Sequence, residues 1–493
     1  KMTNPLGVVT NYNYDAAGNV TSVTKANLVT MAYTYNVYNN IASVTDGEGN
    51  TYKINYDKEG HATKVVDAYG TVITRVDYDA SYNAVKRTDA LGNTEDMTYD
   101  SMGNLVETIT KVNGAKKAVS YSYLGDKLLS SVDATGSNSS YTYDAVGNIS
   151  SITNPNGGVT NYTYDLNNNV TSESIGEGYK ITYKYNALNL LEEKTNSRGQ
   201  NTTYTYDSLG GITSQTDELG TISYTYDNNG NVLTVADEAG TITRTYDKLN
   251  RITSYKDTKG KVIRYEYDSL DNLSKLTYPD GKEVTYTYNN NGNMLSATDW
   301  EDRTTSYEYN KNSQLTKTTR PDGTIEVRTY DKAGNLTAIK DKRNNTIINY
   351  YEYNYDSAGN IISVTSNSSK VDNREALSNA KMTYDENNRL LTYNTKEVKY
   401  DADGNMIYGP LDGVMSEFTY DCRNRLVKAG DTVYQYDAEN RRIAVTTGKK
   451  RTEYVVDSSK ELSQVLMATS ATVNKDGKMT GDITYYTYGN GLL

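Results

Sequence analysis

The sequence has little of what enzymes and metal sites are usually built from. Among 493 residues it contains one His, His61, and one Cys, Cys422. Hydrolytic triads and zinc sites need several such residues together, and a lone cysteine cannot form an internal disulfide. We therefore expect no catalytic residue, no bound metal and no cofactor.

Apolar and basic residues are also scarce. Only 36% of the chain is hydrophobic, and 49 Tyr stand against one Phe and one Trp, which argues against a thick conventional core. The formal charge of −11 and the pI near 4.9 argue against a nucleic-acid partner, because neutralising phosphates needs clustered Lys and Arg. The short basic cluster at 449–451, which follows Gly448, fits a solvated hairpin tip.

Long apolar segments are missing as well. The sequence has no run of 18 apolar residues for a membrane span, and no signal peptide opens it. Because the repeat described next is already running at Tyr12, we expect a targeting segment upstream of this sequence. No long helix-period stretch is present apart from the short run 373–381, so we expect an all-β fold.

What the chain has in abundance is one short motif, typified by YTYDAVGN at 141–148. We take as its marker the Tyr that precedes Asp or Asn, with Tyr123 filling one gap. From Tyr14 to Tyr330, 15 intervals cover 316 residues, and only the interval from Tyr99 to Tyr123 falls outside 20 to 22 residues. Such a period predicts a repeat architecture.

One repeat reads as two strands joined by turns. In the copy from Tyr143 to Tyr164, a turn at 144–147, a strand at 148–153, a turn at 154–157 and a strand at 158–164 follow one another. Asp at the first turn position can accept a hydrogen bond from the backbone two residues on, and Gly at the fourth suits the left-handed conformation. This spacing recurs at both ends of the strands, which predicts an antiparallel meander.

The Tyr residues of a repeat are expected to share one face of the sheet. Tyr162 and Tyr164 are two apart, and stacked repeats would place such pairs in ladders whose rings cover backbone and whose hydroxyls stay in water. In the other strand, Ile149 and Ile152 are three apart, which sends them to opposite faces unless a β-bulge follows the turn. The pattern leaves inside and outside unassigned.

The marker spacing predicts three regions. Residues 1–355 form a regular array, 356–436 hold irregular repeats with a protruding polar loop at 366–370, and 437–493 form a terminating or capping β segment. The 21 markers from Tyr14 to Tyr436, at two strands each, predict about 42 strands. Open sheets seldom exceed ~10 strands without curling, so we expect the meander to wind into a spiral, hollow β shell.

We predict a structural role for the marker Tyr, the Asp after it and the Gly that closes the turn. The residues assigned in this way are Tyr14, Asp15, Gly18, Tyr56, Asp57, Gly60, Tyr99, Asp100, Gly103, Tyr143, Asp144, Gly147, Tyr164, Asp165, Tyr206, Asp207, Gly210, Tyr226, Asp227, Gly230, Tyr267, Asp268, Tyr330, Asp331 and Gly334.

The repeat resembles that of the Rhs/YD-repeat family. The resemblance rests on the pattern YxYDxxGN, on the turns YPDG at 278–281 and RPDG at 320–323, and on the terminal YTYGNGLL at 486–493, and it covers nearly the whole chain. It implies a cocoon-like β shell, as in bacterial polymorphic toxins, wall-associated bacterial proteins and teneurins. It also implies a secreted or cell-surface bacterial protein.

The function implied by this resemblance is a structural shell that houses or displays a C-terminal toxin or effector polypeptide, its expected partner, encoded beyond Leu493. Family members usually carry a self-cleavage site and the variable toxin past the point where this sequence stops. Neither activity is therefore carried over to any residue here.

Several residues invite other readings. His61 stands where the motif normally has Asn, so a ligand role is disfavoured against a place in the turn. The repeated Asp suggests calcium, but calcium solenoids use a nine-residue repeat, and here each Asp has a turn to cap. Trp300 could be a ligand platform, although covering a neighbouring strand is the simpler role, and Cys422 reads as a substitute for a small turn residue.

A second class of function stays open, namely a cell-surface adhesion or carbohydrate-binding array, with surface glycans as partners. Such arrays are also aromatic hairpins of about 20 residues, but their sites commonly use Trp at the repeat spacing, and this chain has one Trp. A third class, an enzyme, has almost nothing in its favour.

Overall fold

We describe a computed structural model of the chain, over residues 1–112, 115–176, 178–356, 359–367, 380–459, 462–472 and 481–493. These residues form 47 β-strands and no helix, so the predicted all-β fold is confirmed. No helix in this part of the chain has the length and apolarity needed to cross a membrane. Residues 373–379 of the possible helical run, and 368–370 of the expected polar loop, lie outside the described ranges.

Strands β1 to β35 belong to one sheet of 35 strands. Their bounds are β1 (Met2–Thr3), β2 (Val9–Tyr14), β3 (Val20–Lys25), β4 (Leu28–Tyr35), β5 (Ile41–Asp46), β6 (Thr51–Tyr56), β7 (Ala62–Val66), β8 (Val72–Tyr78), β9 (Ala84–Asp89), β10 (Thr94–Tyr99), β11 (Leu105–Val112), β12 (Ala115–Leu124), β13 (Lys127–Val132), β14 (Asn138–Tyr143), β15 (Ile149–Thr153), β16 (Val159–Tyr164), β17 (Val170–Ile175), β18 (Tyr179–Tyr185), β19 (Leu191–Thr195), β20 (Asn201–Tyr206), β21 (Ile212–Asp217), β22 (Gly220–Tyr226), β23 (Val232–Asp237), β24 (Gly240–Tyr246), β25 (Ile252–Lys256), β26 (Val262–Tyr267), β27 (Leu273–Thr277), β28 (Glu283–Tyr288), β29 (Met294–Thr298), β30 (Thr304–Tyr309), β31 (Leu315–Thr319), β32 (Ile325–Tyr330), β33 (Leu336–Arg343), β34 (Thr346–Tyr355) and β35 (Ile361–Ser366).

The remaining strands form a sheet of three, β36 to β38, and a sheet of nine, β39 to β47. Their bounds are β36 (Met382–Tyr384), β37 (Leu390–Tyr393), β38 (Lys396–Glu397), β39 (Lys399–Tyr400), β40 (Met406–Leu411), β41 (Val414–Tyr420), β42 (Leu426–Ala429), β43 (Thr432–Tyr436), β44 (Arg442–Thr447), β45 (Lys450–Asp457), β46 (Gln464–Thr472) and β47 (Asp482–Tyr485). The predicted hairpin is confirmed, with Gly448 and Lys449 joining β44 to β45. The basic cluster is not all at its tip, because Lys450 and Arg451 lie in β45 and Arg451 pairs with Glu453.

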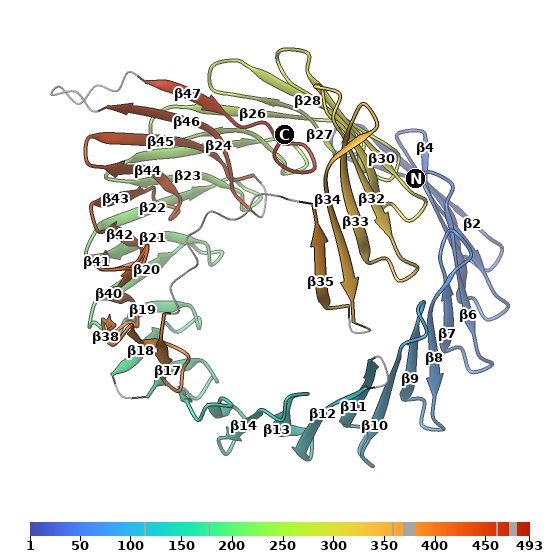
Figure 1. Ribbon diagram of the computed structural model, residues 1–493, viewed down its shortest axis with the longest axis horizontal. Coiled ribbons are helices and arrows are strands. Elements are labelled where there is room, and N and C mark those ends of the chain that lie inside the picture. Colours follow the sequence, from blue (N-terminus) through green and yellow to red (C-terminus); the bar gives the residue numbers. More distant parts are fainter. Residues whose placement is uncertain (113–114, 177, 357–358, 368–379, 460–461, 473–480) are drawn as a thin grey trace. The chain divides into compact units, whose positions relative to one another are not determined.

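Neighbouring strands in the sequence pair as antiparallel hairpins (Figure 1). A register shift recurs at the marker Tyr: Thr142 pairs with Ser151, but Tyr143 pairs with Ile149, so Ser150 is an extra residue. The same shift occurs at Tyr14, Tyr56, Tyr226 and most other markers. Of the two possibilities that the spacing of the Ile residues left open, the structure therefore shows the bulge.

The bulge sorts the side chains of a repeat onto two faces. Ile149 and Ile152 pair with Tyr143 and Tyr141, so all four lie on one face, which we call the Tyr face. The other face carries hydroxyls, as at Thr142, whose Oγ1 lies 2.6 Å from the Oγ of Ser151. Since Thr142 is exposed while the Tyr face is half-buried, the apolar side chains of the repeat gather in one layer.

The expectation that the marker hydroxyls stay in water is wrong. The hydroxyl of Tyr164 donates to the carbonyl of Ile149, at 2.8 Å, and Tyr226 donates to Ile212 at the same distance. The acceptor is the first residue after the preceding YD turn, next to the bulge, where the ladder of sheet hydrogen bonds is interrupted. Each such tyrosine therefore satisfies a backbone carbonyl of the preceding repeat and locks the two repeats together.

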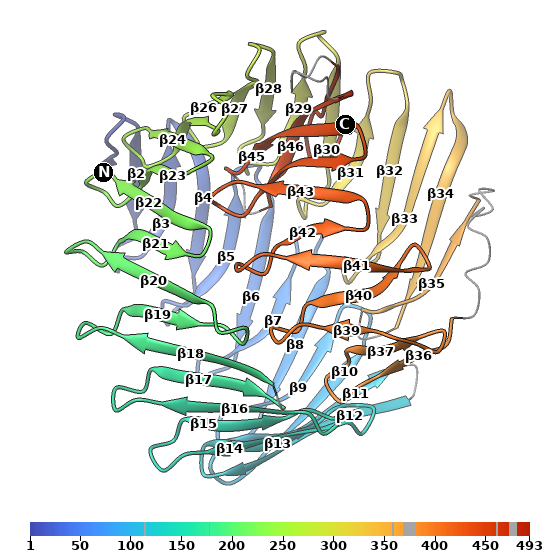
Figure 2. The ribbon, with the colours of Figure 1, turned by 90° about the vertical axis from the view of Figure 1, so that its left-hand side faces the viewer.

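The chain divides into two compact units. Unit 1 comprises Lys1–Ser137, Tyr265–Asn373 and Thr487–Leu493, and unit 2 comprises Asn138–Arg264 and Arg374–Tyr486. In unit 2, β39 to β47 lie beside the green strands from β16 to β24 (Figure 2). The largest fully buried apolar side chains of unit 2 are Ile222, Val235, Ile242, Ile263 and Leu466.

In unit 1 the terminal YGNGLL segment is anchored to a Tyr pair. The backbone N–H of Asn490 donates to the hydroxyl of Tyr307 at 3.2 Å, and its side-chain amide donates to that of Tyr309 at 2.5 Å. A Cβ on Gly489 would lie 2.0 Å from the Tyr307 hydroxyl, so this approach requires glycine. The division predicted at 355 and 436 follows repeat spacing and stays a prediction.

Candidate functional site

The turn that follows each marker Tyr, the YD turn, is built around its first Asp. In the turn at 144–148, one carboxylate oxygen of Asp144 accepts the N–H of Val146 at 3.0 Å and of Asn148 at 2.9 Å. Gly147 has a φ of 105°, in the left-handed region. Both turn assignments made from the sequence, Asp as a cap and Gly as the left-handed residue, hold here and at Asp15, Asp57 and Asp227.

The predicted marker residues occupy these turns and strand ends one set per repeat. They do not converge on a common centre, and no group of three or more His, Cys, Asp or Glu in the described ranges is placed to hold a metal ion. Their importance for stability is an open prediction, and the turns matter here because they form the edges of the sheet.

Sequence reasoning missed the fifth residue of the YD turn, usually Asn. The side-chain amide of Asn148 donates to Asp144 at 3.2 Å and to the side-chain oxygen of Asn168, in the next YD turn, at 2.8 Å. Asn231 makes the same two bonds, to Asp227 and Asn250. The recurrence of Asn after the turn Gly was the signal that could have indicated this link between successive turns.

His61 takes the place of that Asn, which agrees with the structural reading. Its Nδ1 lies 3.1 Å from a carboxylate oxygen of Asp57, and its ring stacks on Tyr82 with centroids 4.7 Å apart. Burial acts to raise the pKa of Asp57, but hydrogen bonds from the backbone and ring of His61 outweigh it and lower the pKa. The histidine therefore completes a turn and links two repeats.

The other singled-out residues are also packed into turns. Trp300 lies edge-on to the buried Tyr278, with centroids 5.3 Å apart, and Lys282 lies over its ring. This position covers a neighbouring repeat, as the simpler reading expected. Cys422 is half-buried in a YD turn, where burial raises the pKa of its thiol.

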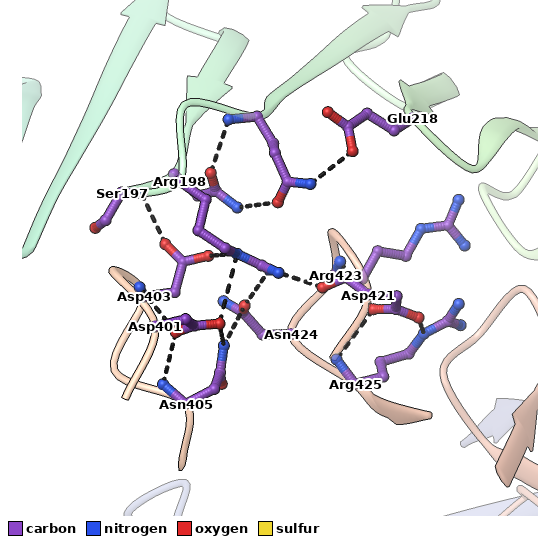
Figure 3. Close-up of polar contacts among 12 residues, drawn as sticks. Ser197, Arg198, Glu218, Asp401, Asp403, Asn405, Asp421, Arg423, Asn424 and Arg425 are labelled. Carbon is purple, nitrogen blue, oxygen red and sulfur yellow. Dashed lines mark hydrogen bonds and ion pairs between the residues drawn. The ribbon is translucent and has the colours of Figure 1, made fainter. Parts of the chain in front are cut away.

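The turns at the other end of the strands, which we call opposite turns, bring distant repeats together in unit 2. Arg198, in the opposite turn 196–200, donates from Nε to Asp403 at 2.6 Å, and from Nη2 to the carbonyl of Asp421 and the side chain of Asn424 at 2.7 Å (Figure 3). The N–H of Ser197 also donates to Asp403. One opposite turn is thus clamped between two YD turns.

We call this line of contacts in unit 2 the unit 2 seam. In its next contact the charges are exchanged, so that the cation lies on the YD turn and the carboxylate on the opposite turn. Arg423, the third residue of its YD turn, donates from Nε and Nη2 to the two carboxylate oxygens of Asp217, at 2.6 and 3.0 Å. The side chain of Asp217 is 1% exposed and that of Arg423 is 9% exposed. Burial acts to raise the pKa of Asp217, but the hydrogen bonds from Arg423 and Leu219 and the charge of Arg423 hold it below its usual value.

One further contact extends the unit 2 seam at each end, a charged one at Glu439 and an uncharged one at Asn387. Glu439, again the third residue of a YD turn, accepts two hydrogen bonds from Nη2 of Arg244 at 2.6 Å, and Arg441 lies over the ring of Tyr255. At the other end Asn387 meets Asn154, and a Cβ on Gly158 would lie 2.1 Å from the Asn387 side-chain oxygen. Glycine is needed there because the two turns approach so closely.

Unit 1 has a seam of the same geometry but simpler chemistry. Asn291, third in its YD turn, donates to Asp46 at 2.7 Å, and Asn312, third in the next, donates to Asp67 at 2.8 Å. In both cases the carboxylate of the first residue of an opposite turn accepts a hydrogen bond from the side-chain amide. A Cβ on Gly47 would lie 2.8 Å from the carbonyl oxygen of Asn290, so the turns approach closely in this seam too.

Comparison with known proteins gives matches to two family models and to solved structures. Residues 82–244 and 348–457, more than half of the chain, match the family model described as Teneurin YD-shell, and residues 1–30, 246–283 and 272–304 match the RHS repeat. The curated proteins contain no match.

Among solved structures, the crystal structure of TcdB2-TccC3 is similar over 98% of this chain, with a TM-score of 0.64 and 15% identity. This chain covers 31% of that one, so it spans about a third of its length. A Photorhabdus luminescens Tc holotoxin pore matches over 98% of this chain and 25% of its own, with 15% identity and a TM-score of 0.40. At this identity, the first likeness establishes the fold alone.

Proposed function

The chain belongs to the Teneurin YD-shell family, as its motifs indicated, and from this premise we propose that it forms part of the wall of an encapsulating shell. The shell would house or display a C-terminal toxin or effector polypeptide that is not part of this sequence. We further propose that the wall itself is not an enzyme and that the protein acts outside a bacterial cell or at its surface.

The observation that carries this proposal is how little of the chain is buried. The accessible surface is 28333 Å², whereas a compact protein of 54.8 kDa exposes roughly 18,000 Å². The apolar side chains occupy one face of the sheet, and each repeat is fastened to the next by tyrosine and asparagine hydrogen bonds. Such construction suits a thin wall, because it needs no thick core on either side.

Small-angle scattering of the purified chain tests whether it encloses space. A compact protein of this length has a radius of gyration of about 23 Å, and a wall around a cavity must exceed it clearly. We expect a larger value and, in electron micrographs, a shell with a low-density interior. A radius of gyration near 23 Å with a solid particle would overturn the proposal.

The adhesion alternative is distinguished by binding rather than by shape. We expect the full chain to bind no glycan on an array of defined oligosaccharides, because the tyrosine hydroxyls described above are engaged with backbone carbonyls. Saturable binding of one glycan class by the full chain, abolished by Tyr-to-Phe changes on the Tyr face, would contradict the container and support the adhesive function.

A further inference from the structure

We propose that the alternating charges on the unit 2 seam set the register in which its two runs of repeats stack. The seam charges are Arg198 and Asp217 on the opposite turns, Arg244 in β24, and Asp403, Arg423 and Glu439 on the YD turns. This inference deepens the proposed shell function, on which it rests for its purpose, because a wall that winds past itself must choose one of several equivalent stackings.

The choice is real because the repeats are built alike. The third positions of successive YD turns, at 403, 423 and 439, lie 20 and 16 residues apart. The opposite turns at 217–220 and 237–240 share one hairpin geometry, with Asp217 paired to Gly220 and Asp237 to Gly240. Backbone shape alone therefore does not distinguish the observed stacking from one shifted by a repeat. Side chains at the seam must make the distinction, as charged side chains do between coiled-coil partners.

The observed register pairs every charge with its opposite. Arg198 meets Asp403 at 2.6 Å, Asp217 meets Arg423 at 2.6 Å, and Arg244 meets Glu439 at 2.6 Å. The two Asp side chains are each 1% exposed, so water cannot screen them. A buried charge that loses its partner is strongly destabilising.

A shift by one repeat in either direction brings like charges together. In one direction Arg423 would face Arg198 and Glu439 would face Asp217. In the other, Asp403 would face Asp217, while Arg423 would face Asp237, the residue equivalent to Asp217 in the next opposite turn. The first shift thus opposes like charges at two contacts and the second at one, so the charges along the seam disfavour both neighbouring registers.

The unit 1 seam lacks this property at its two equivalent contacts. Asp46 and Asp67 both accept an amide from the third residue of a YD turn, Asn291 or Asn312. A shift by one repeat would place Asn312 against Asp46 with the same chemistry. These two contacts therefore carry no register information, although Lys25 and Asp271 form an ion pair between other repeats of unit 1.

The single native cysteine makes the register measurable. Cys422 interacts with Asp217 and with the backbone of Leu219, so it marks this opposite turn. A second cysteine introduced by Leu219→Cys reports the observed register through a short bismaleimide cross-link. One introduced instead by Ala239→Cys, in the exposed turn one repeat further on, reports the shifted register.

The decisive variant exchanges the charges on the YD side, Asp403→Arg with Arg423→Asp. In the observed register it opposes like charges at both contacts, whereas shifting by one repeat brings the reversed charge at 403 against Asp217 and leaves a single like-charge contact, between position 423 and Asp237. We expect the cross-link to position 219 to fall at least tenfold and the link to position 239 to rise. Adding Arg198→Asp and Asp217→Arg restores all pairings and should restore the link to 219.

Two results would overturn the proposal. One is an undiminished cross-link to position 219 in the exchanged variant. The other is a four-residue variant with the circular dichroism of the wild type but no recovery of that link.

Should the exchanged variant not fold, the four-residue variant decides alone. Asn291→Ala in unit 1 serves as a control that should leave the cross-link to position 219 unchanged. Because cross-linking reads the seam directly, its failure is separable from failure of the shell proposal, which scattering tests.

Discussion

The two seams of this protein solve one geometric problem with different chemistry. In unit 1 the third residue of two YD turns, Asn291 or Asn312, donates to a carboxylate, and the contact is repeated without change. In unit 2 the same position is Asn at 387 but Asp, Arg or Glu at 403, 423 and 439, and each of these three is paired with an opposite charge. The comparison teaches that the backbone of the repeat permits stacking, while one variable position decides how strong and how selective the stacking is.

Physical chemistry predicts different consequences for the two seams. An amide–carboxylate hydrogen bond contributes about 1.5 to 3 kcal/mol, and its loss leaves no unpaired cation. A buried ion pair contributes little net stability against an apolar pair, but breaking it from one side is costly. Unit 2 should therefore depend far more on its seam residues than unit 1.

The largest effect is expected from Arg423→Ala, which leaves the carboxylate of Asp217 buried without its cation. The free energy of unfolding should fall by about 3 to 5 kcal/mol in a urea titration. The matched change in unit 1, Asn291→Ala, should cost about 1.5 kcal/mol, because the Asp46 carboxylate keeps its other hydrogen bonds. Equal losses for the two variants would remove the distinction between the seams.

Removing a marker ring should have a similar effect in both units, since the Tyr face is built the same way in each. Tyr226→Ala, in unit 2, and Tyr56→Ala, in unit 1, should each cost up to about 3 kcal/mol, because the rings are half-buried. Tyr226→Phe, which loses only the bond to Ile212, should cost about 1 kcal/mol. Asn229→Ala, at an exposed turn, should cost less than that. Equal denaturation midpoints for Tyr226→Ala and Asn229→Ala would refute the structural role of the marker.

Acid should weaken the charged seam. The pKa of Asp217 is lower in the folded chain than its usual value, so its contribution is complete above about pH 4, the unfolded value, and is lost as the pH falls through the folded pKa. In Arg423→Ala the cation is gone, so burial raises the pKa of Asp217. The variant should therefore not show the loss of stability on acidification that Asp217 causes in the wild type. The stability gap between wild type and variant should therefore be widest near pH 6 and narrow below pH 4 in thermal melts. A constant gap from pH 6 to pH 2.5 would contradict this assignment.

The smallest effect, none at all, is expected from metal removal. Each turn Asp spends its carboxylate on backbone and side-chain N–H groups, as at Asp144 and Asp227, which leaves little for a cation. EDTA should leave the melting temperature unchanged for the wild type and for the seam variants alike. A drop of several degrees that calcium reverses would show that the turns bind ions.

Much of the local structure was readable from the sequence. The period of the marker predicted a two-stranded repeat, and the Asp and Gly spacing predicted the turn hydrogen bonds. The three-residue separation of Ile149 and Ile152 pointed to either a bulge or side chains on opposite faces. All of these depend on residues within one repeat, where backbone preferences and side-chain periodicity act over a few positions.

The links between repeats were harder to foresee. The hydroxyl of Tyr164 reaches the carbonyl of Ile149, which lies beside the bulge of the preceding repeat. The Asn148 amide reaches a turn 20 residues away. A recurring Tyr or Asn shows that a position matters, but not which neighbouring atom it serves.

By itself, the sequence determined the repeat, its all-β character and the family to which the chain belongs. Only the tertiary structure decided that Asn291 meets Asp46 and that Arg423 meets Asp217, 245 and 206 residues away. The physical reason is that local propensities act within one hairpin and are nearly the same in every repeat. Which distant turns come together depends on the accumulated geometry of many hairpins and on the charges that tell one turn from the next.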